Sequence, residues 1–441
     1  GDYAIISQPY KDFPADQAGL KTGDVIRKIN GESIKGWQLE KVSDNLKGIP
    51  ETEVTITIKR LGREEPFEKT VVRQDLHINS VPYYGMSEKN KGVGYIRLTK
   101  FTQGSGQEVR EAFSDLKENH SLDALVLDLR SNPGGLLMEA VNVANVFIPK
   151  GEEIVSTRGR VEKWNQTYQT EKQPLDTNIR LVVMVNRASA SASEIVAGAV
   201  QDLDRGVVIG RRTFGKGLVQ ATRPLSYNSK LKVTTAKYYI PSGRCIQAKD
   251  YSNRNEDGSV GEIPDSLIQK YTTENGRKVY DGGGIRPDIE VDPGDLSKIE
   301  ISLLTKNLIF DFATQYALTH DTIPPVDQWE VDDDTYQAFT GFLEGKDWDY
   351  TTESKEKLKK LIETAKEEQY YERAADELQE LEKKLSHDKM KDLQRFKTSI
   401  QERLEQEIAG RYYYQKGQIQ AGLEEDQQLE KARSVSADTA L

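Results

Sequence analysis

Residues 185–220 read VNRASASASEIVAGAVQDLDRGVVIGRRTFGKGLVQ, and this stretch decides how the centre of the chain folds. The apolar run at 181–185 predicts a buried strand, and the apolar periodicity of residues 195–203 predicts a helix. Ser191 therefore falls at a turn between a strand and a helix. Because a helix N-terminus offers unpaired N–H groups and a positive dipole end, a serine at this position is well placed to act as a nucleophile.

A nucleophilic serine needs a base, and this stretch offers a lysine, Lys216, between two glycines. The histidines of the chain all lie elsewhere: His77, His120, His320 and His387. A lysine accepts a proton only in its neutral form, which removal from water favours, so we expect Phe214, Leu218 and Val219 to shield Lys216. The structural alternative is that the Ala-Ser alternation fills a close helix contact and that the Gly-Lys-Gly triplet is a solvated turn.

Three separated motifs carry a resemblance to a known family: SASASE at 189–194, TFGKG at 213–217 and LDLRSNPGG at 127–135. In this order they resemble the C-terminal processing, or tail-specific, serine peptidases, over roughly residues 1–292. The resemblance implies that Ser191 is the nucleophile and Lys216 the base, with Gln220 completing a triad. It also implies an oxyanion hole made by the N–H of Ala192 and that of Gly134 or Gly135, and the residue pattern does not choose between these glycines.

Two further positions near the motifs have weaker local support. Lys216 and Gln220 would share one face of a strand, but four residues of straight strand span about 13 Å, so direct contact requires a bend near Gly217. Glu194 falls in the first turn of the predicted helix, where an acidic residue is favourable for the helix dipole. We therefore predict a structural rather than a catalytic role for Glu194.

Residues 1–75 form the first predicted domain. Residues 3–7, 23–31 and 53–59 have strand patterns, and the second of these ends in an Asn-Gly turn. The segment AGLKTGDVI at 18–26 resembles the second half of a PDZ domain, a module that captures C-terminal peptides as an added strand. The strand and carboxylate-binding loop that open such a domain are not found, so we predict a partial PDZ domain with weak peptide binding.

Residues 76–298 alternate strand and helix patterns and predict an α/β core, which the resemblance implies is of the ββα, crotonase-like type. Within it, residues 249–284 form a polar, loop-like insertion whose acidic residues lack the spacing of a calcium loop, so we assign no metal. Residues 299–441 predict a helical C-terminal extension. Its helices carry apolar stripes with too few apolar residues for a core of their own, so we expect them to pack on the peptidase core or to join two chains as a homodimer.

Composition excludes several classes of partner. The 441 residues carry a formal net charge of −10 and a pI near 5.3, which disfavours nucleic acid or an anionic membrane surface. The single cysteine, Cys245, cannot form an internal disulfide and is predicted to be a structural thiol. No apolar run approaches the roughly 20 residues of a membrane span. No signal peptide is visible, and the resemblance implies a periplasmic or otherwise extracytoplasmic location.

The sequence thus predicts a serine endopeptidase that cleaves proteins near their C-terminus through an acyl-enzyme and needs no cofactor. Its expected substrates are proteins or peptides with accessible C-terminal tails. One alternative is a catalytically inactive, PDZ-containing protein that binds peptides or acts as a scaffold. A second is an enzyme of thioester chemistry on a similar core, which would require an adenine and pantetheine pocket that no sequence feature indicates.

Overall fold

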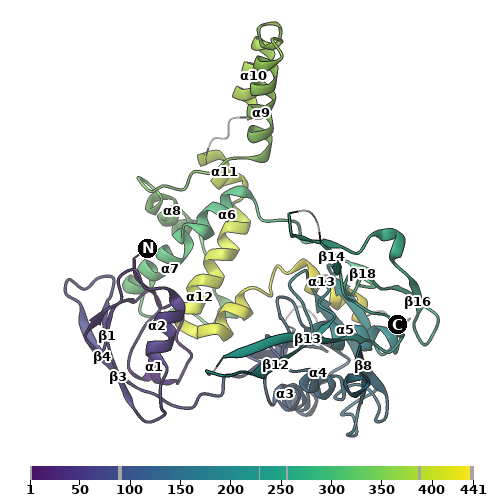
Figure 1. Ribbon diagram of the computed structural model, residues 1–441. Helices are drawn as coiled ribbons and strands as arrows, with labels where there is room; N and C mark the ends of the chain where they lie inside the picture. The colour runs from purple at the N-terminus through teal and green to yellow at the C-terminus, as the bar shows by residue number, and fades with distance from the viewer. Residues whose placement is uncertain (1, 88–91, 228, 255–256, 386–388, 438–441) are drawn as a thin grey trace. The chain divides into compact units, whose positions relative to one another are not determined.

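The computed structural model describes residues 2–87, 92–227, 229–254, 257–385 and 389–437 (Figure 1). The chain divides into two compact units. The first unit comprises Gly1–His77 and Gly294–Glu425, and the second comprises Ile78–Pro293 and Asp426–Leu441. The chain therefore leaves the first unit, builds most of the second, returns, and ends in the second.

A six-stranded sheet of order β18-β11-β10-β7-β6-β5 forms the centre of the second unit. The strands are β5 (Tyr83–Met86), β6 (Val93–Arg97), β7 (Ala124–Asp128), β10 (Arg180–Val185), β11 (Val207–Gly210) and β18 (Ile289–Glu290). All neighbours pair in parallel except β5, which runs antiparallel to β6. Helices α3 (Ser105–Asn119), α4 (Leu137–Ala144) and α5 (Ala192–Asp202) contribute to one buried apolar cluster with strands β6, β7, β10 and β11.

The register of β7 and β10 positions the candidate site. Met184 near the end of β10 pairs with Asp128 at the end of β7. Because parallel neighbours have their carboxyl ends at the same edge of a sheet, the segments that follow these two strands start side by side. One of them leads to the turn at 132–135, and the other leads to Ser191.

A second sheet in this unit is antiparallel, with the order β12-β13-β8-β9. Its strands are β8 (Glu153–Gly159), β9 (Gln166–Gln169), β12 (Leu218–Pro224) and β13 (Lys230–Tyr239). The polar insertion that was predicted to be loop-like contains two small hairpins: β14 (Lys249–Arg254) with β15 (Val260–Glu262), and β16 (Lys270–Thr272) with β17 (Lys278–Tyr280). Residues 255 and 256 of the insertion lie outside the described residues. Short polar strands give no apolar periodicity, which is why the sequence did not predict these hairpins.

The N-terminal part of the first unit is a four-stranded antiparallel sheet of order β2-β1-β3-β4. It is built from β1 (Val25–Ile29), β2 (Glu32–Ser33), β3 (Glu53–Lys59) and β4 (Phe67–Val72), with α1 (Pro14–Gln17) and α2 (Leu39–Leu46). Asn30 and Gly31, at φ 50° and 83°, form the predicted Asn-Gly turn between β1 and β2. The strand expected at residues 3–7 is reduced to a single bridge between Ile5 and Val25.

The helices that follow are α6 (Lys298–Thr305), α7 (Leu308–Thr319), α8 (Asp333–Phe342), α9 (Glu353–Glu367), α10 (Ala375–Leu385), α11 (Lys389–Arg395), α12 (Lys397–Ala421) and α13 (Gln427–Ala437). Contrary to expectation, this region has its own core, in which residues from α6 to α8 pack with Leu393, Ile400, Leu404 and Ile408. The prediction failed because the stripe of α12 is buried against helices of the same region. Helices α9 and α10 form a hairpin that extends away from the other helices of this unit (Figure 1).

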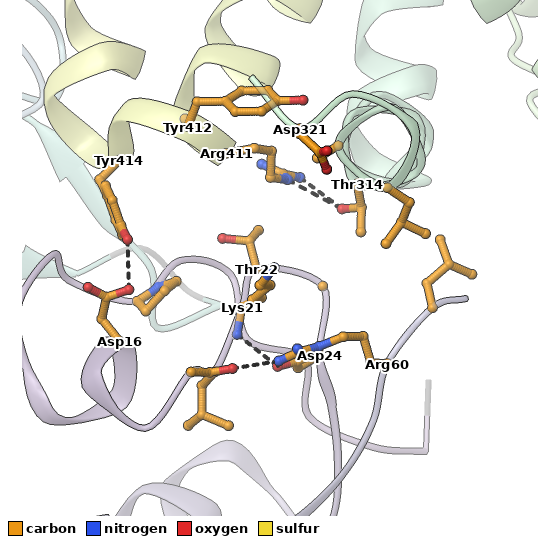
Figure 2. Close-up of a pocket in the computed structure, with 18 residues that line it drawn as sticks. Asp16, Lys21, Thr22, Asp24, Arg60, Thr314, Asp321, Arg411, Tyr412 and Tyr414 are labelled. Atoms are coloured by element: carbon orange, nitrogen blue, oxygen red, sulfur yellow. Dashed lines mark hydrogen bonds and ion pairs between the residues drawn. The ribbon is translucent and has the colours of Figure 1, made fainter. Parts of the chain in front are cut away.

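A cavity of about 420 Å³ lies within the first unit, between the small sheet domain and helices α7 and α12 (Figure 2). Its polar side chains already bind one another: Tyr414 donates to Asp16 over 2.7 Å, and Arg411 donates to the Thr314 hydroxyl over 3.1 Å. Tyr414 lies at φ 56° and ψ −153° and interrupts α12. None of the predicted site residues lines this cavity.

Candidate active site

Ser191 lies between β10 and α5, as the sequence predicts, and has φ 57° and ψ −113°. This backbone conformation is costly for a residue with a side chain, and such strain is often found at functional sites. The small residues on either side allow the sharp turn, since Ala190 and Ala192 are buried without crowding it. Ser191 itself is half-buried, and α5 begins at the next residue.

Asn132 connects residues 132–135, the glycine turn, to the segment between β10 and α5 that carries Ser191, the serine turn. Its backbone carbonyl accepts hydrogen bonds from the N–H of Ala190, at 3.0 Å, and from the hydroxyl of Ser193, at 2.9 Å. Its side-chain oxygen accepts the N–H of Gly134 at 2.9 Å. Asn132 is fully buried, so these bonds are protected from competition with water. This role could not be predicted from the sequence, because Ala190 and Ser193 lie about 60 positions further along the chain.

The two candidate glycines differ in the state of their N–H groups. The N–H of Gly134 is already bound to Asn132. Within the part of the chain that the structure describes, neither the N–H of Gly135 nor that of Ala192 makes a hydrogen bond. Gly134 instead faces the serine turn with its Cα, since a Cβ added there would lie 2.8 Å from both the Ala192 nitrogen and the Ser191 Cβ.

Glu194 joins the serine turn to residues 213–217, the lysine turn, which lie between β11 and β12. Its carboxylate accepts four hydrogen bonds of 2.6 to 2.8 Å, from the N–H groups of Ser191, Gly215 and Lys216 and from the hydroxyl of Thr213. Burial raises the pKa of Glu194, and these hydrogen bonds oppose the rise. The role predicted from the helix dipole was therefore incomplete. The only feature of the sequence that pointed to this bridging role is the presence of an acidic residue, Glu194, in a motif of small residues.

Lys216 is exposed, in contrast to the shielding that the sequence predicted. Phe214 is 55% exposed, and Leu218 and Val219 are only half-buried. The prediction failed because it placed these side chains around Lys216 without knowing in which direction the turn presents them. The backbone of Lys216 is held by Glu194, while its side chain extends from the turn that precedes β12.

Tyr238 on β13 also belongs to this site, because its hydroxyl contacts the lysine turn. Its buried hydroxyl donates to the backbone carbonyl of Lys216. Burial raises the pKa of Tyr238 well above its usual value and the charge of Glu194 adds to the rise, while a hydrogen bond with the Ser191 side chain opposes it. Tyr238 could not be predicted as a site residue from the sequence, because only the pairing of β12 with β13 brings it to the lysine turn.

Gln220 lies on β12, is exposed and pairs with Thr234 of β13. The prediction that Lys216 and Gln220 share one face of a regular strand was wrong in two respects. Strand β12 begins only at Leu218, and its register with β13 shifts between Val219 and Gln220. Regular alternation of side chains does not hold across such an irregularity.

The described residues hold no cluster of three or more His, Cys, Asp or Glu side chains arranged to bind a metal ion. Burial raises the pKa of the Cys245 thiol, which disfavours its reactive thiolate form. No helix within the described ranges is both long and apolar enough to cross a membrane.

Comparison with known proteins identifies the parts of the chain. Residues 92–253 match the model of peptidase family S41, residues 5–60 that of the PDZ domain, and residues 299–435 that of the C-terminal helical domain of probable PDZ-proteases. The chain belongs to peptidase family S41. The predicted family, and the predicted combination of a PDZ domain, an α/β peptidase domain and a helical C-terminal region, are thus confirmed.

Two relatives illustrate the similarity of this S41 chain to known proteins. It is 39% identical over 279 residues to a carboxy-terminal-processing protease of Bartonella bacilliformis, covering 63% of this chain and 60% of that protein. It is 41% identical over 253 residues to a probable CtpA-like serine protease of Staphylococcus aureus, covering 56% of this chain and 49% of that protein. The chain therefore spans about half to three fifths of the length of these relatives. Among solved structures, the photosystem II D1 C-terminal processing protease is 30% identical, with a TM-score of 0.38 and coverage of 67% of this chain and 70% of that one.

Proposed function

We propose that this S41 chain is a serine endopeptidase that cleaves proteins near their C-terminus. The observation that carries the proposal is the joining of its three motifs around Ser191. Glu194 binds the backbone of the serine and lysine turns, and Asn132 ties the glycine turn to the serine turn. A nucleophile, a base and N–H donors are thereby held on one rigid frame, which is what acyl transfer requires.

In this proposal the Ser191 hydroxyl attacks the scissile carbonyl carbon while the neutral amine of Lys216 accepts its proton. The N–H groups of Ala192 and Gly135 hold the negative oxygen of the tetrahedral intermediate. Among the described residues neither N–H donates a hydrogen bond to another group, which supports this role. Protonated Lys216 then gives its proton to the leaving amine, and an acyl-enzyme remains. Lys216 activates a water molecule in the same way, and the water releases the acyl group.

Because Lys216 is exposed, the proposed mechanism requires the bound substrate to shield its amine from water. A lysine side chain has a flexible four-carbon stem, and in this proposal the amine of Lys216 turns toward Ser191. A bound peptide that covers the lysine turn would exclude water and favour the neutral amine. Gln220 would orient the amine of Lys216, as the third member of a triad, once the Lys216 side chain turns toward Ser191.

The proposed substrates are proteins or peptides with accessible C-terminal tails. The printed description of the Bartonella relative as a carboxy-terminal-processing protease supports this class. The match to a PDZ domain supports it as well, since such modules bind C-terminal peptides as an added strand. We further propose a homodimer and a periplasmic or otherwise extracytoplasmic location, both supported by family membership.

The test is cleavage of unfolded casein by the purified full chain, beside Ser191→Ala, Lys216→Ala and Lys216→Arg. We expect each variant to lose activity by about 10⁴-fold or more while keeping its fold, the arginine variant because a guanidinium stays protonated. Lys232→Ala, at an exposed position on β13, is the matched control and should cleave normally. A wild-type chain that neither cleaves casein nor reacts with a fluorophosphonate at Ser191 would overturn the proposal and favour a peptide-binding protein.

A further inference from the structure

Helix α13 belongs to the unit that contains the active site. It is the last described helix of the chain and follows α12 of the first unit by only a few residues. It packs on β7, β10 and β11, and buries Leu429, Ala432 and Val435. Strands β7 and β10 are the two that lead into the glycine turn and the serine turn, so α13 packs on the strands that position these turns.

Residues at the start of α13 bind Arg130 of the peptidase domain. Asp426 caps the helix through Oδ1, which accepts the N–H groups of Gln428 at 3.0 Å and Leu429 at 3.1 Å. Its other oxygen lies 2.5 Å from Nη2 of Arg130. Nη1 of Arg130 donates to the Gln428 side chain at 3.1 Å, and that side chain in turn donates to the carbonyl of Val291 at 2.8 Å.

On its other side Arg130 meets a buried carboxylate at the end of β7. Asp128 is fully buried and lies 2.7 Å from Arg130 and 2.5 Å from Arg97, and it accepts the Tyr95 hydroxyl at 2.6 Å. Burial alone would raise the pKa of Asp128, but the two arginines hold it well below its usual range, so the carboxylate stays charged. The guanidinium of Arg130 is therefore fixed between Asp128 and the start of α13.

Arg130 directly precedes the glycine turn. Its backbone carbonyl accepts a hydrogen bond from Arg97 at 2.7 Å, and its N–H donates to Asp128 at 2.8 Å. The next residue, Ser131, has φ 56° and donates its N–H to Asn186 at 2.9 Å. Asn132 and the two glycines follow. Side chain and backbone of Arg130 are thus both held, and the turn that carries the free N–H of Gly135 starts from this fixed point.

We propose that α13 is a positioning element of the active site: Asp426 and Gln428, through Arg130, hold the glycine turn where its N–H meets the oxyanion on a substrate attacked by Ser191. The inference rests on the proposed peptidase function. These residues do not touch the substrate, so their loss should slow the chemical step and leave substrate binding unchanged. A misplacement of reacting groups by about 1 Å can reduce the rate about 100-fold.

The test uses full-length variants and a fluorogenic peptide substrate, below the unfolding temperature of every variant. Asp426→Asn retains a good capping residue and removes only the charge that binds Arg130, while Gln428→Ala removes the second contact. We expect kcat to fall about 10- to 100-fold in the double variant, with KM within about twofold of wild type. Fluorophosphonate labelling of Ser191 should slow in parallel, and amide hydrogen exchange in residues 131–137 should become faster.

Glu430→Gln is the matched control, because it breaks an ion pair with Arg433 on the same helix but leaves Arg130 untouched. It should keep the kcat of wild type. A double variant with wild-type kcat, or one whose KM alone changes, would overturn the inference. If the wild-type chain itself neither cleaves nor is labelled, the proposed function fails instead, so the two failures are distinguishable.

Discussion

Ser191 and Lys216 donate their backbone N–H groups to the same oxygen atom, Oε2 of Glu194, each over 2.8 Å. The other oxygen of this carboxylate accepts the hydroxyl of Thr213 at 2.6 Å and the N–H of Gly215 at 2.7 Å. The candidate nucleophile and base come from different turns, and one buried side chain fixes both. The relative position of the Ser191 and Lys216 backbones therefore depends on Glu194, a side chain that need not touch the substrate.

Glu194→Gln should lower both stability and activity. An amide has one acceptor oxygen, so its NH₂ group would face two of the four donors, and each buried donor left without an acceptor costs about 1–3 kcal/mol. We expect the free energy of unfolding to fall by roughly 2–6 kcal/mol and casein cleavage by more than about tenfold. Urea unfolding and a cleavage assay would measure both. Glu162→Gln, at an exposed position, should change neither, and an equally stable, fully active Glu194→Gln would contradict the role.

Gly134→Ala should disturb the serine turn by direct contact. A Cβ at this position would lie 2.6 Å from the Ala190 carbonyl oxygen and 2.8 Å from the Ala192 nitrogen, which are backbone atoms beside Ser191. Gly134 also has φ 95°, which costs about 1–2 kcal/mol for a residue with a side chain.

Gly151→Ala separates these two effects, because Gly151 has φ 96° and no atom within 4 Å of the added Cβ. Both alanine variants should melt at a lower temperature than wild type, but only Gly134→Ala should also lose turnover, by about tenfold or more. Thermal melts and kcat measurements at a common low temperature would show the difference. Equal turnover in both variants would mean that the glycine turn does not bear on the serine.

The sequence predicted the parts of the site that lie within continuous motifs. Ser191 was placed correctly at a strand-to-helix turn because the apolar run before it and the periodicity after it are local signals. The roles of Asn132, Glu194 and Arg130 could not be predicted, since each depends on partners that only the folded sheet brings near. The direction of the Lys216 side chain was also beyond the sequence, because neighbouring residue types do not determine how a turn presents its side chains.

In the helical region, the sequence predicted the apolar stripes but not the surfaces that bury them. The apolar stripes were recognised, and a stripe must be buried, but the sequence does not say against what. Leu393, Ile400, Leu404 and Ile408 pack with residues of the preceding helices and so form a core that was not expected. Exposed leucines remain on α9 and α10, at Leu361 and Leu381, and also on α6 and α7, at Leu304 and Leu318.

Glu405 should make the stability of the first unit depend on pH. Burial raises its pKa to about 7, helped by the charges of Glu330 and Glu402, while a hydrogen bond from Val331 opposes the rise. The folded protein therefore holds this proton more tightly than the unfolded chain does. The free energy of unfolding should rise as pH falls through about 7, and the gain should be complete near pH 4.3, the usual pKa of a glutamate.

Glu405→Gln is the appropriate comparison, because its amide oxygen can keep the 2.9 Å hydrogen bond from Val331 without the titration. Thermal melts of wild type at pH 5.5 and 7.5 should differ by more than those of the variant, with wild type gaining at the lower pH. An unchanged difference between the two proteins would show that Glu405 does not titrate in this range.

The hairpin of α9 and α10 gives the proposed homodimer a specific surface. Leu358 and Leu378 are buried, whereas Leu361 is 53% and Leu381 41% exposed. Burying such leucines on a second copy would contribute about 1.5–3 kcal/mol for each fully buried side chain.

We expect light scattering to report a dimer for the full chain and a monomer for the double variant Leu361→Glu, Leu381→Glu. Point variants are required because truncation at Pro325 would remove more than half of the buried residues of the helical core. Leu39→Glu, on an exposed position of α2, is the control and should remain dimeric. A monomeric wild type at high concentration would refute the dimer, and a dimeric double variant would place its interface elsewhere.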